Sequence, residues 1–384
     1  MAEDIPTSVY VHYPFCIKKC PYCDFNSHTR NRESLTEAYF DALKEDLVAQ
    51  QEQWGRKKIL SIFFGGGTPS LMPPRHVEGI LEAISKQHDV ATDCEITLEA
   101  NPGTVDRQSF KDFYSAGINR LSIGVQSFNN QSLQSIGRIH DRGHAIKAIE
   151  SALNLPFQSI NCDLMYGLPN QSISDAMQDL EQATLLKPQH ISWYELTIEP
   201  NTYFHRFPPK RPSDDLRDHI ETEGLKWLKD HGYQRYEISG FSQPGQTCKH
   251  NRNYWLFGDY IGIGAGAHSK ITDRHGRITR QVKYKHPKQY IEATTPKIIQ
   301  ANTLKPQEHC LEFMMNALRL MEPISFDLFE AHTLQSRSTI IKALNFCKKE
   351  LLMEYNKQAF WPTAKGHRYL NDLLSVFNQD ATSK

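Results

Sequence analysis

Six short apolar runs, separated by longer segments of helical period, occupy the chain from residue 8 to about residue 200. They are rich in β-branched and aromatic residues and read SVYVHY, ILSIFFGGG, EITLEANP, RLSIGVQS, SINCDLMYG and HISWYELT. Helix starts are marked between them by Pro73 and Pro74 and by Ser172 with Asp175. Strands that alternate with helices in this way predict βα units and a parallel sheet.

The end of each run turns polar or glycine-rich, at Gly65, Glu99, Gln126, Asp163 and Thr197. A carboxylate at the end of an apolar strand is costly unless it faces a ligand or a partner, and barrel active sites gather at that edge. We therefore predict an α/β fold, an incomplete (β/α)6-type TIM barrel whose rim carries the site. A doubly wound open sheet is the alternative, and it also binds ligands at the carboxyl ends of its strands.

Three units are expected along the chain. Residues 1–235 form the partial barrel, and residues 236–300 form an irregular extension rich in Gly, Asn and aromatic residues. Residues 301–384 show helical patterns and predict a small, mainly helical, winged-helix-like domain. Helical spacing explains the Met and aromatic residues of EFMMNALRLM as core.

Charge and hydropathy narrow the class of protein. Lys plus Arg equals Asp plus Glu at 44 each, without a long run of one sign, so nothing indicates a nucleic-acid partner. The first residues lack the basic and apolar regions of a signal peptide, and no stretch of about 18 apolar residues occurs. We expect a cytoplasmic protein with at most peripheral membrane association.

Three of the eight cysteines stand close together as CxxxCxxC, at Cys16, Cys20 and Cys23, directly after the first predicted strand. In a reducing compartment such a group is typical of a metal site, and three thiolates leave one coordination position open. Two alternatives remain: a structural zinc with a distant fourth ligand, such as Cys248 or a histidine, and a redox CxxC at Cys20 and Cys23.

Two glycine-rich stretches carry further information. GGGTP, at residues 65–69, lets a ligand approach the main chain, and its N–H groups could hold a carboxylate, although a tight turn explains it equally. GIGAGAHS, at residues 262–269, nominally matches a dinucleotide fingerprint, but no amphipathic helix follows. We interpret it as a loop that closes the rim.

The motif YxHxPFCxxxCxYC, followed by GGGTP, resembles the radical S-adenosylmethionine (SAM) superfamily. The similarity extends over nearly all the chain to the oxygen-independent coproporphyrinogen oxidase family and its heme-chaperone relatives. The resemblance implies a 4Fe-4S cluster on three cysteines. Its open iron binds SAM, and an electron from it cleaves SAM to a 5'-deoxyadenosyl radical.

The resemblance also implies roles for individual residues. Cys16, Cys20 and Cys23 would hold the cluster. The residues expected around a first SAM are Tyr10, Tyr22, Gly66, Gly67, Thr68 and Glu99, and those expected around a second SAM are Gln126, Arg138 and Asp163. Their chemistry suits the roles, since carboxylates accept hydrogen bonds from ammonium or ribose groups and Arg can fork onto a carboxylate. A structural ion pair at the rim is the alternative for Glu99, Arg138 and Asp163.

Three features separate the oxidase from the chaperone. Cys23 is followed by DFNS rather than by a further CxC cysteine, Tyr10 lies almost at the start, and residues 250–255 contain HNxxYW, similar to a motif proposed for heme binding. His250 is then the candidate iron ligand, with Cys248 as a second candidate and with Tyr254 and Trp255 placed to stack on the macrocycle. A hydrogen-bonded structural histidine is the alternative for His250.

The sequence thus predicts a cluster-bearing protein that binds heme as cargo. Its expected partners are heme-accepting proteins such as respiratory enzymes, with bacterioferritin as a candidate donor. A dimer and SAM cleavage are both compatible with this assignment, whereas coproporphyrinogen oxidase activity is not expected.

Overall fold

The computed structural model describes residues 5–29 and 34–378, and it contains the six predicted strands. They are β1 (Thr7–Tyr13), β4 (Lys58–Gly66), β5 (Asp89–Ala100), β6 (Arg120–Gln126), β7 (Ser159–Tyr166) and β8 (His190–Glu195). All are parallel and lie side by side in chain order. A doubly wound sheet reverses its strand order, so that alternative is wrong and the incomplete barrel is confirmed.

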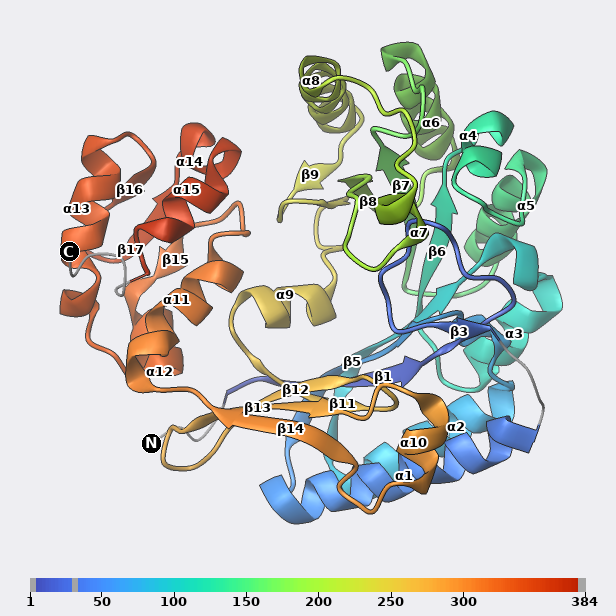
Figure 1. Cartoon of the computed structure of the whole chain (residues 1–384), viewed down its shortest axis with the longest axis horizontal. Helices are drawn as coiled ribbons and strands as arrows, with labels where there is room; N and C mark the ends of the chain where they lie inside the picture. Colours follow the sequence, from blue (N-terminus) through green and yellow to red (C-terminus); the bar gives the residue numbers. More distant parts are fainter. Residues whose placement is uncertain (1–4, 30–33, 379–384) are drawn as a thin grey trace.

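Helices cover the outer face of this curved sheet (Figure 1). They are α1 (Ser34–Trp54), α2 (Pro74–Gln87), α3 (Arg107–Ser115), α5 (Arg142–Leu153), α6 (Ile173–Leu186) and α8 (Asp214–Asp230), with the short α4 (Asn130–Ser135) and α7 (Tyr203–Arg206) nearer the rim. Pro74 opens α2, and Ser172 with Asp175 forms a capping box at the start of α6, as predicted.

The segment 236–300 is more regular than expected. It contains β10 (Gly240–Ser242), α9 (Lys249–Trp255), β11 (Asp259–Ile263), β12 (His268–Thr272), β13 (Ile278–Lys283), α10 (Pro287–Glu292) and β14 (Ile298–Thr303). β11 pairs with β1, and β12 to β14 follow as antiparallel strands, so that the sheet has twelve strands with β9 (Gln234–Arg235) at its other edge. The prediction of an irregular extension was wrong because β13 and β14 mix polar and apolar residues without a continuous apolar run.

The stretch GIGAGAHS forms the turn between β11 and β12. Gly264 and Gly266 adopt positive φ angles of 106° and 78°, which only glycine adopts readily. The side-chain amide of Asn26 donates a hydrogen bond of 2.8 Å to the carbonyl oxygen of Ala265. The turn therefore lies against the loop that carries the three clustered cysteines.

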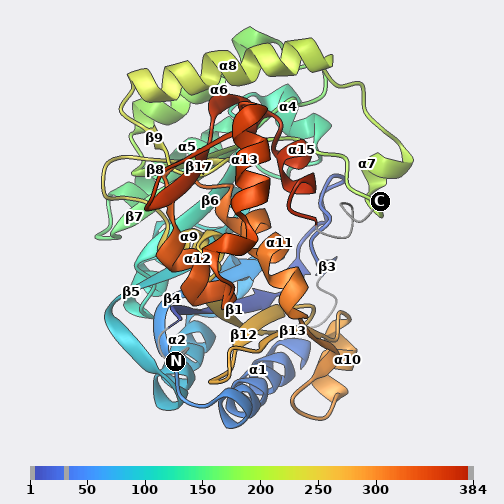
Figure 2. The same cartoon turned by 90° about the vertical axis from the view of Figure 1, so that its left-hand side faces the viewer.

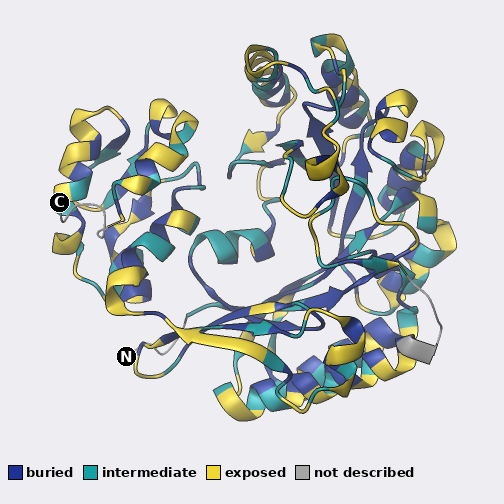
Figure 3. Cartoon of the chain, in the orientation of Figure 1, coloured by how far each residue is buried: buried dark blue, intermediate teal, exposed yellow. Residues whose placement is uncertain are grey.

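The C-terminal unit has a core of its own. Its elements are α11 (Pro306–Ala317), β15 (Ile324–Ser325), α12 (Phe326–Thr333), α13 (Ile341–Lys349), β16 (Met353–Tyr355), β17 (Ala359–Pro362), α14 (Ala364–Arg368) and α15 (Leu370–Ser375). Its helices accompany a three-stranded sheet in the order β15-β17-β16. Of the residues predicted as core, Phe313 and Met314 are buried, whereas Met315 is 52% exposed. Figure 2 shows this unit in front of the barrel, and Figure 3 shows buried residues concentrated in both units.

α9 connects the two units. It packs on the inner side of β1, β4 and β11, and its Arg252 forms an ion pair of 2.6 Å with Glu322 of the C-terminal unit. No helix among the described residues has the length and apolar character needed to cross a bilayer.

Candidate cluster and cofactor cavity

A cavity of about 490 Å³ opens at the carboxyl ends of the barrel strands. It brings together all three clustered cysteines and most of the predicted SAM-binding residues: Tyr22, Gly66, Gly67, Thr68, Glu99, Gln126, Arg138 and Asp163. Their sequence positions span more than 140 residues, and strand order alone brings them to one rim. Of the predicted residues, Tyr10 and His250 do not line it.

The cysteine loop is held in a compact turn. Phe15–Cys16 (β2) pairs with His28–Thr29 (β3), and the N–H of Cys23 donates to the carbonyl oxygen of Cys20 at 3.2 Å. Lys19 Nζ donates to the carbonyl oxygen of Phe25 at 3.1 Å. These bonds close the loop that carries the three cysteines, all of which line one cavity.

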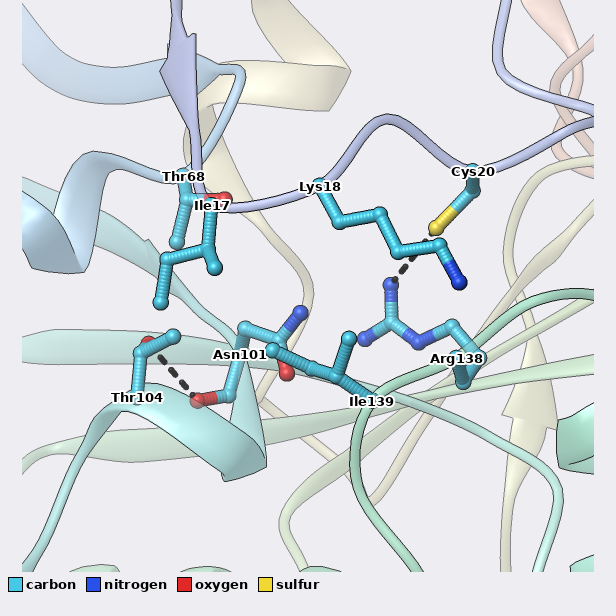
Figure 4. Close-up of a pocket in the computed structure, with 8 residues that line it drawn as sticks. All are labelled: Ile17, Lys18, Cys20, Thr68, Asn101, Thr104, Arg138 and Ile139. Atoms are coloured by element: carbon cyan, nitrogen blue, oxygen red, sulfur yellow. Dashed lines mark hydrogen bonds between the residues drawn. The ribbon is translucent and has the colours of Figure 1, made fainter. Parts of the chain in front are cut away.

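The surroundings of the sulfurs fit an anionic cluster. Arg138 Nη1 donates to Cys20 Sγ at 3.7 Å, and Figure 4 shows its guanidinium pointing at that sulfur. Burial raises the pKa of Cys16 and of Cys23, so bound iron and nearby positive charge are what would favour their thiolate forms. A Cβ added to Gly67 would lie 3.0 Å from Cys16 Sγ, so only glycine leaves room beside this ligand.

The zinc alternative has less support from the geometry. In the described part of the chain, no three His, Cys, Asp or Glu side chains lie close enough to hold one metal ion. Cys248, the proposed distant ligand, does not line the cavity and donates instead to Glu95 Oε1 at 3.3 Å. A cubane places each thiolate on a different iron and therefore needs wider spacing than a single ion does.

The glycine turn permits close approach, but its N–H groups are already bonded. Gly66 N donates to Glu99 Oε2 at 3.1 Å, Gly67 N to Tyr13 O at 2.7 Å and Thr68 N to Phe15 O at 2.9 Å. One of them does hold a carboxylate, that of Glu99, so in this conformation the three N–H groups have protein acceptors and none is left for the carboxylate of a ligand. What the turn offers a ligand is a surface without side chains.

Two acidic side chains, Glu99 and Asp163, face the cavity, and no basic side chain in the described part of the chain bonds to either of them. Burial, and next the charge of Asp163, raise the pKa of Glu99 to about 8. Burial also raises the pKa of Asp163, although Ser122 Oγ and Asn161 Nδ2 donate to it at 2.9 and 2.7 Å. Such carboxyl groups can accept hydrogen bonds from an ammonium or from ribose hydroxyls, and a bound cation favours their charged forms.

Gln126 is positioned by the turn that follows β6, and Arg138 donates through Nη2 to the carbonyl oxygen of Gly124 in that strand. Gln126 has a φ of 70°, and its Oε1 accepts a bond of 2.8 Å from the hydroxyl of Tyr194. The next two residues bond to the buried Asp179 of α6, which accepts from Ser127 Oγ at 2.8 Å and from Phe128 N at 2.6 Å. Asp179 thus holds an unusual backbone conformation in place from outside the cavity.

The sequence analysis missed several residues that line the cavity. They are Arg120, Ser122, Asn161, Ser192, Tyr194 and Asn251. Most could have been found from period 2 along the strands, because Arg120, Ser122 and Gln126 share one face of β6, as Asn161 and Asp163 do on β7. Asn251 gave no such signal, since it lies on the short helix α9.

The two predicted residues outside the cavity are packed together beneath it. The ring of Tyr10 lies 6.4 Å from that of His250, and its hydroxyl bonds to His12 Nδ1 at 3.0 Å. His250 is stacked on Phe63 at 4.9 Å, and its Nδ1 lies 3.0 Å from Ser61 Oγ. Burial, and next the positive charge of Arg120, lower the pKa of His250 to about 3.

Comparison with known proteins agrees with this geometry. Residues 10–183 match the family model "Radical SAM superfamily". The chain is 44% identical to the heme chaperone HemW of Haemophilus influenzae and 42% identical to that of Escherichia coli, in each case over 97% of this chain and 98% of the relative.

A solved structure, that of the radical SAM enzyme coproporphyrinogen III oxidase (HemN) from Escherichia coli, superposes with a TM-score of 0.83 at 23% identity. It covers 98% of this chain and 91% of the solved chain, which shows a shared fold. Radical SAM membership implies a 4Fe-4S cluster and SAM as cofactors. With its family model and its full-length relatives, the chain belongs to the HemW family within the radical SAM superfamily.

Proposed function

We propose that this chain is a cluster-bearing heme chaperone, which binds heme and delivers it to heme-dependent proteins in the cytoplasm. The observation that carries the proposal is its identity of 42–44%, over almost its whole length, to proteins named heme chaperone HemW. The motif DFNS after Cys23 and the motif HNxxYW support it. Acceptors such as respiratory enzymes and bacterioferritin as a donor are part of the proposal.

The residue assignments follow the cavity. Cys16, Cys20 and Cys23 would hold the cluster, which when bound supplies the electron that can cleave SAM. The residues proposed to seat SAM are Tyr22, Gly66, Gly67, Thr68, Glu99, Gln126, Arg138 and Asp163, all of which line one cavity with the cysteines. Tyr10 would act from beneath, where its ring is stacked on that of Phe63 at 6.3 Å and supports the cavity wall.

His250, the candidate ligand of heme iron, does not itself line the cavity. Its ring is stacked behind Phe63, which does line the cavity. Ligation of heme iron by His250 therefore requires movement of Phe63 or α9. Because Arg252 of α9 is paired with Glu322, movement of the C-terminal unit, residues 301–384, is the natural source of such a change.

The decisive experiment uses one anaerobically reconstituted sample in two assays. Heme titration followed by absorbance should show stoichiometric uptake, and coproporphyrinogen should remain unconverted. His250→Ala should weaken heme uptake, whereas the control His219→Ala, on the exposed face of α8, should not. Efficient formation of the porphyrinogen product, or no heme uptake by the unaltered chain, would refute the chaperone.

A further inference from the structure

Arg120 is a buried cation that the fold does not use for hydrogen bonding. It begins β6, is 3% exposed and lines the cavity. Within the described residues its side chain makes no hydrogen bond, and its buried Nε has no acceptor. A guanidinium has five N–H donors, and leaving charged donors unpaired in a protein interior is costly.

The nearest carboxylate, that of Glu95, does not serve as a hydrogen-bond acceptor for Arg120. Glu95 Oε2 lies 3.8 Å from Arg120 Nε, too far for a hydrogen bond. The carboxylate of Glu95 already accepts hydrogen bonds from other donors. Lys249 N and His250 N each donate to it at 3.0 Å, and Cys248 Sγ donates to it at 3.3 Å. Glu95 therefore anchors the start of α9, and it offers Arg120 charge balance only.

Arg120 keeps its charge in this place. Burial lowers the pKa of Arg120, but Cys248 and Glu95 raise it, with a net increase. Its field reaches both neighbouring histidines, since it lowers the pKa of His190 and of His250 in addition to the effect of burial. His190 and His250 therefore stay neutral, and Arg120 supplies the positive charge beside them.

Asn251 is the second unused polar group at this end. It lines the same cavity, and among the described residues no hydrogen bond to its side-chain amide is formed. It stands directly after His250 in the motif HNxxYW, on the helix that Glu95 anchors. Within this motif it is Asn251, rather than His250, that faces the cavity.

We propose that Arg120 and Asn251 form a carboxylate-binding subsite at the floor of the cavity. A guanidinium matches a carboxylate in a two-bond fork, and an amide N–H adds a third donor. Asp163, which lines the same cavity, accepts hydrogen bonds from Ser122 and Asn161, and burial favours its neutral form. Because Arg120 keeps its charge and its fork of donors is free of protein acceptors among the described residues, the ligand that suits this subsite carries a planar carboxylate.

Two sources can supply this carboxylate. The first is a propionate of heme, in which case the inference rests on the proposed function. The second is the amino-acid end of a SAM molecule. The two share the recognising chemistry, and they are distinguished by comparing heme with its dimethyl ester and by measuring SAM binding separately.

The test measures binding to the anaerobically reconstituted full chain. The ligands are heme, heme dimethyl ester, which lacks free carboxylates, and SAM. The variants are Arg120→Gln, Arg120→Lys and Asn251→Ala, and the control is Arg75→Gln, an exposed arginine paired with Glu37 on the outer surface. Cluster absorbance and the thermal unfolding midpoint of each variant are recorded first.

We expect Arg120→Gln to weaken heme binding about 10- to 100-fold, and Asn251→Ala to weaken it several-fold. The dimethyl ester should bind the unaltered chain weakly and be insensitive to either substitution. A loss confined to SAM would support the subsite and assign its carboxylate to SAM. If heme and SAM bind both variants within about twofold of the unaltered chain, the subsite is refuted.

Failures of folding and of the proposed function remain distinguishable. If Arg120→Gln does not take up the cluster, the other two variants test the subsite in its place. Arg120→Lys keeps the positive charge but removes the two-bond fork. Asn251→Ala alters a half-buried position. If the unaltered chain binds no heme, the chaperone proposal fails, and SAM binding alone then decides the subsite.

Discussion

Polar residues at the rim of the barrel, where the strands end, face the cavity, whereas most of those at the floor, around Glu95 and α9, are bonded to other protein groups. At the rim, the carboxyl group of Glu99 faces the cavity and, among the described residues, accepts one hydrogen bond, from Gly66 N. At the floor, Glu95 and Asn253 are saturated by internal bonds, as when Asn253 Nδ2 donates to Ser8 Oγ at 2.9 Å and to the carbonyl oxygen of Asp259 at 2.8 Å. Arg120 and Asn251 are exceptions at the floor.

This difference separates two motifs that look alike in the sequence. The triplet CxxxCxxC and the motif HNxxYW are both short and rich in ligand-type residues. The first lies in a loop that presents its side chains to the cavity, whereas the second forms α9, which packs His250 against β4. A motif therefore identifies chemistry only after the fold shows which side chains remain free.

The largest expected effect is at the rim. Replacement of Cys16, Cys20 and Cys23 together by Ala should abolish iron-sulfur absorbance after reconstitution, because no other described cysteine lines the cavity. Cys248→Ala, at the floor, should retain the absorbance. Iron bound in unchanged amount by the triple variant would contradict the ligand assignment.

At the floor, the expected effect is on stability. His250→Ala removes a stacked ring and its contact with Ser61, and it should lower the free energy of unfolding by about 2–4 kcal/mol. Chemical denaturation of the reconstituted protein measures this change, while cluster absorbance at zero denaturant should be unchanged. A variant as stable as the unaltered chain would show that the stacking of His250 and its contact with Ser61 do not stabilise the fold.

Gly67→Ala tests the space beside a cluster ligand. The new Cβ would lie 2.8 Å from Phe15 O and 3.0 Å from Cys16 Sγ, so that the turn must shift. We expect SAM affinity to fall about tenfold or more, as measured by equilibrium binding to the reconstituted protein. Gly143→Ala, in the first turn of α5, where the nearest atom is 3.3 Å away, is the matched control and should bind SAM normally.

The last prediction concerns the pH dependence of stability. The pKa of Glu99 is about 8 in the folded protein against an ordinary value of 4.5, so the folded state holds a proton that the unfolded state releases. Its contribution to stability is therefore present below about pH 4.5 and is lost as the pH rises toward 8. Unfolding midpoints of the cluster-free protein should fall less steeply over this range in Glu99→Gln. Identical slopes would contradict the raised pKa.

The sequence by itself determined the parallel βα order, the cysteine triplet and the rim position of the polar residues that end the strands, such as Glu99, Gln126 and Asp163. Apolar runs of period 2 and clustered thiols are local signals, and the carboxyl ends of adjacent parallel strands necessarily meet at one edge. That is why Glu99, Gln126 and Asp163 could be assigned to one site from their places at strand ends.

Only the tertiary structure decided the course of residues 236–300 and the roles within HNxxYW. β11 to β14 extend the sheet through pairing with β1 and with one another, and β13 and β14 mix polar and apolar residues without a continuous apolar run. Whether His250 or Asn251 faces the cavity depends on how Glu95 anchors α9 against β4. Contacts between residues more than 150 positions apart fix that orientation, and no local pattern encodes them.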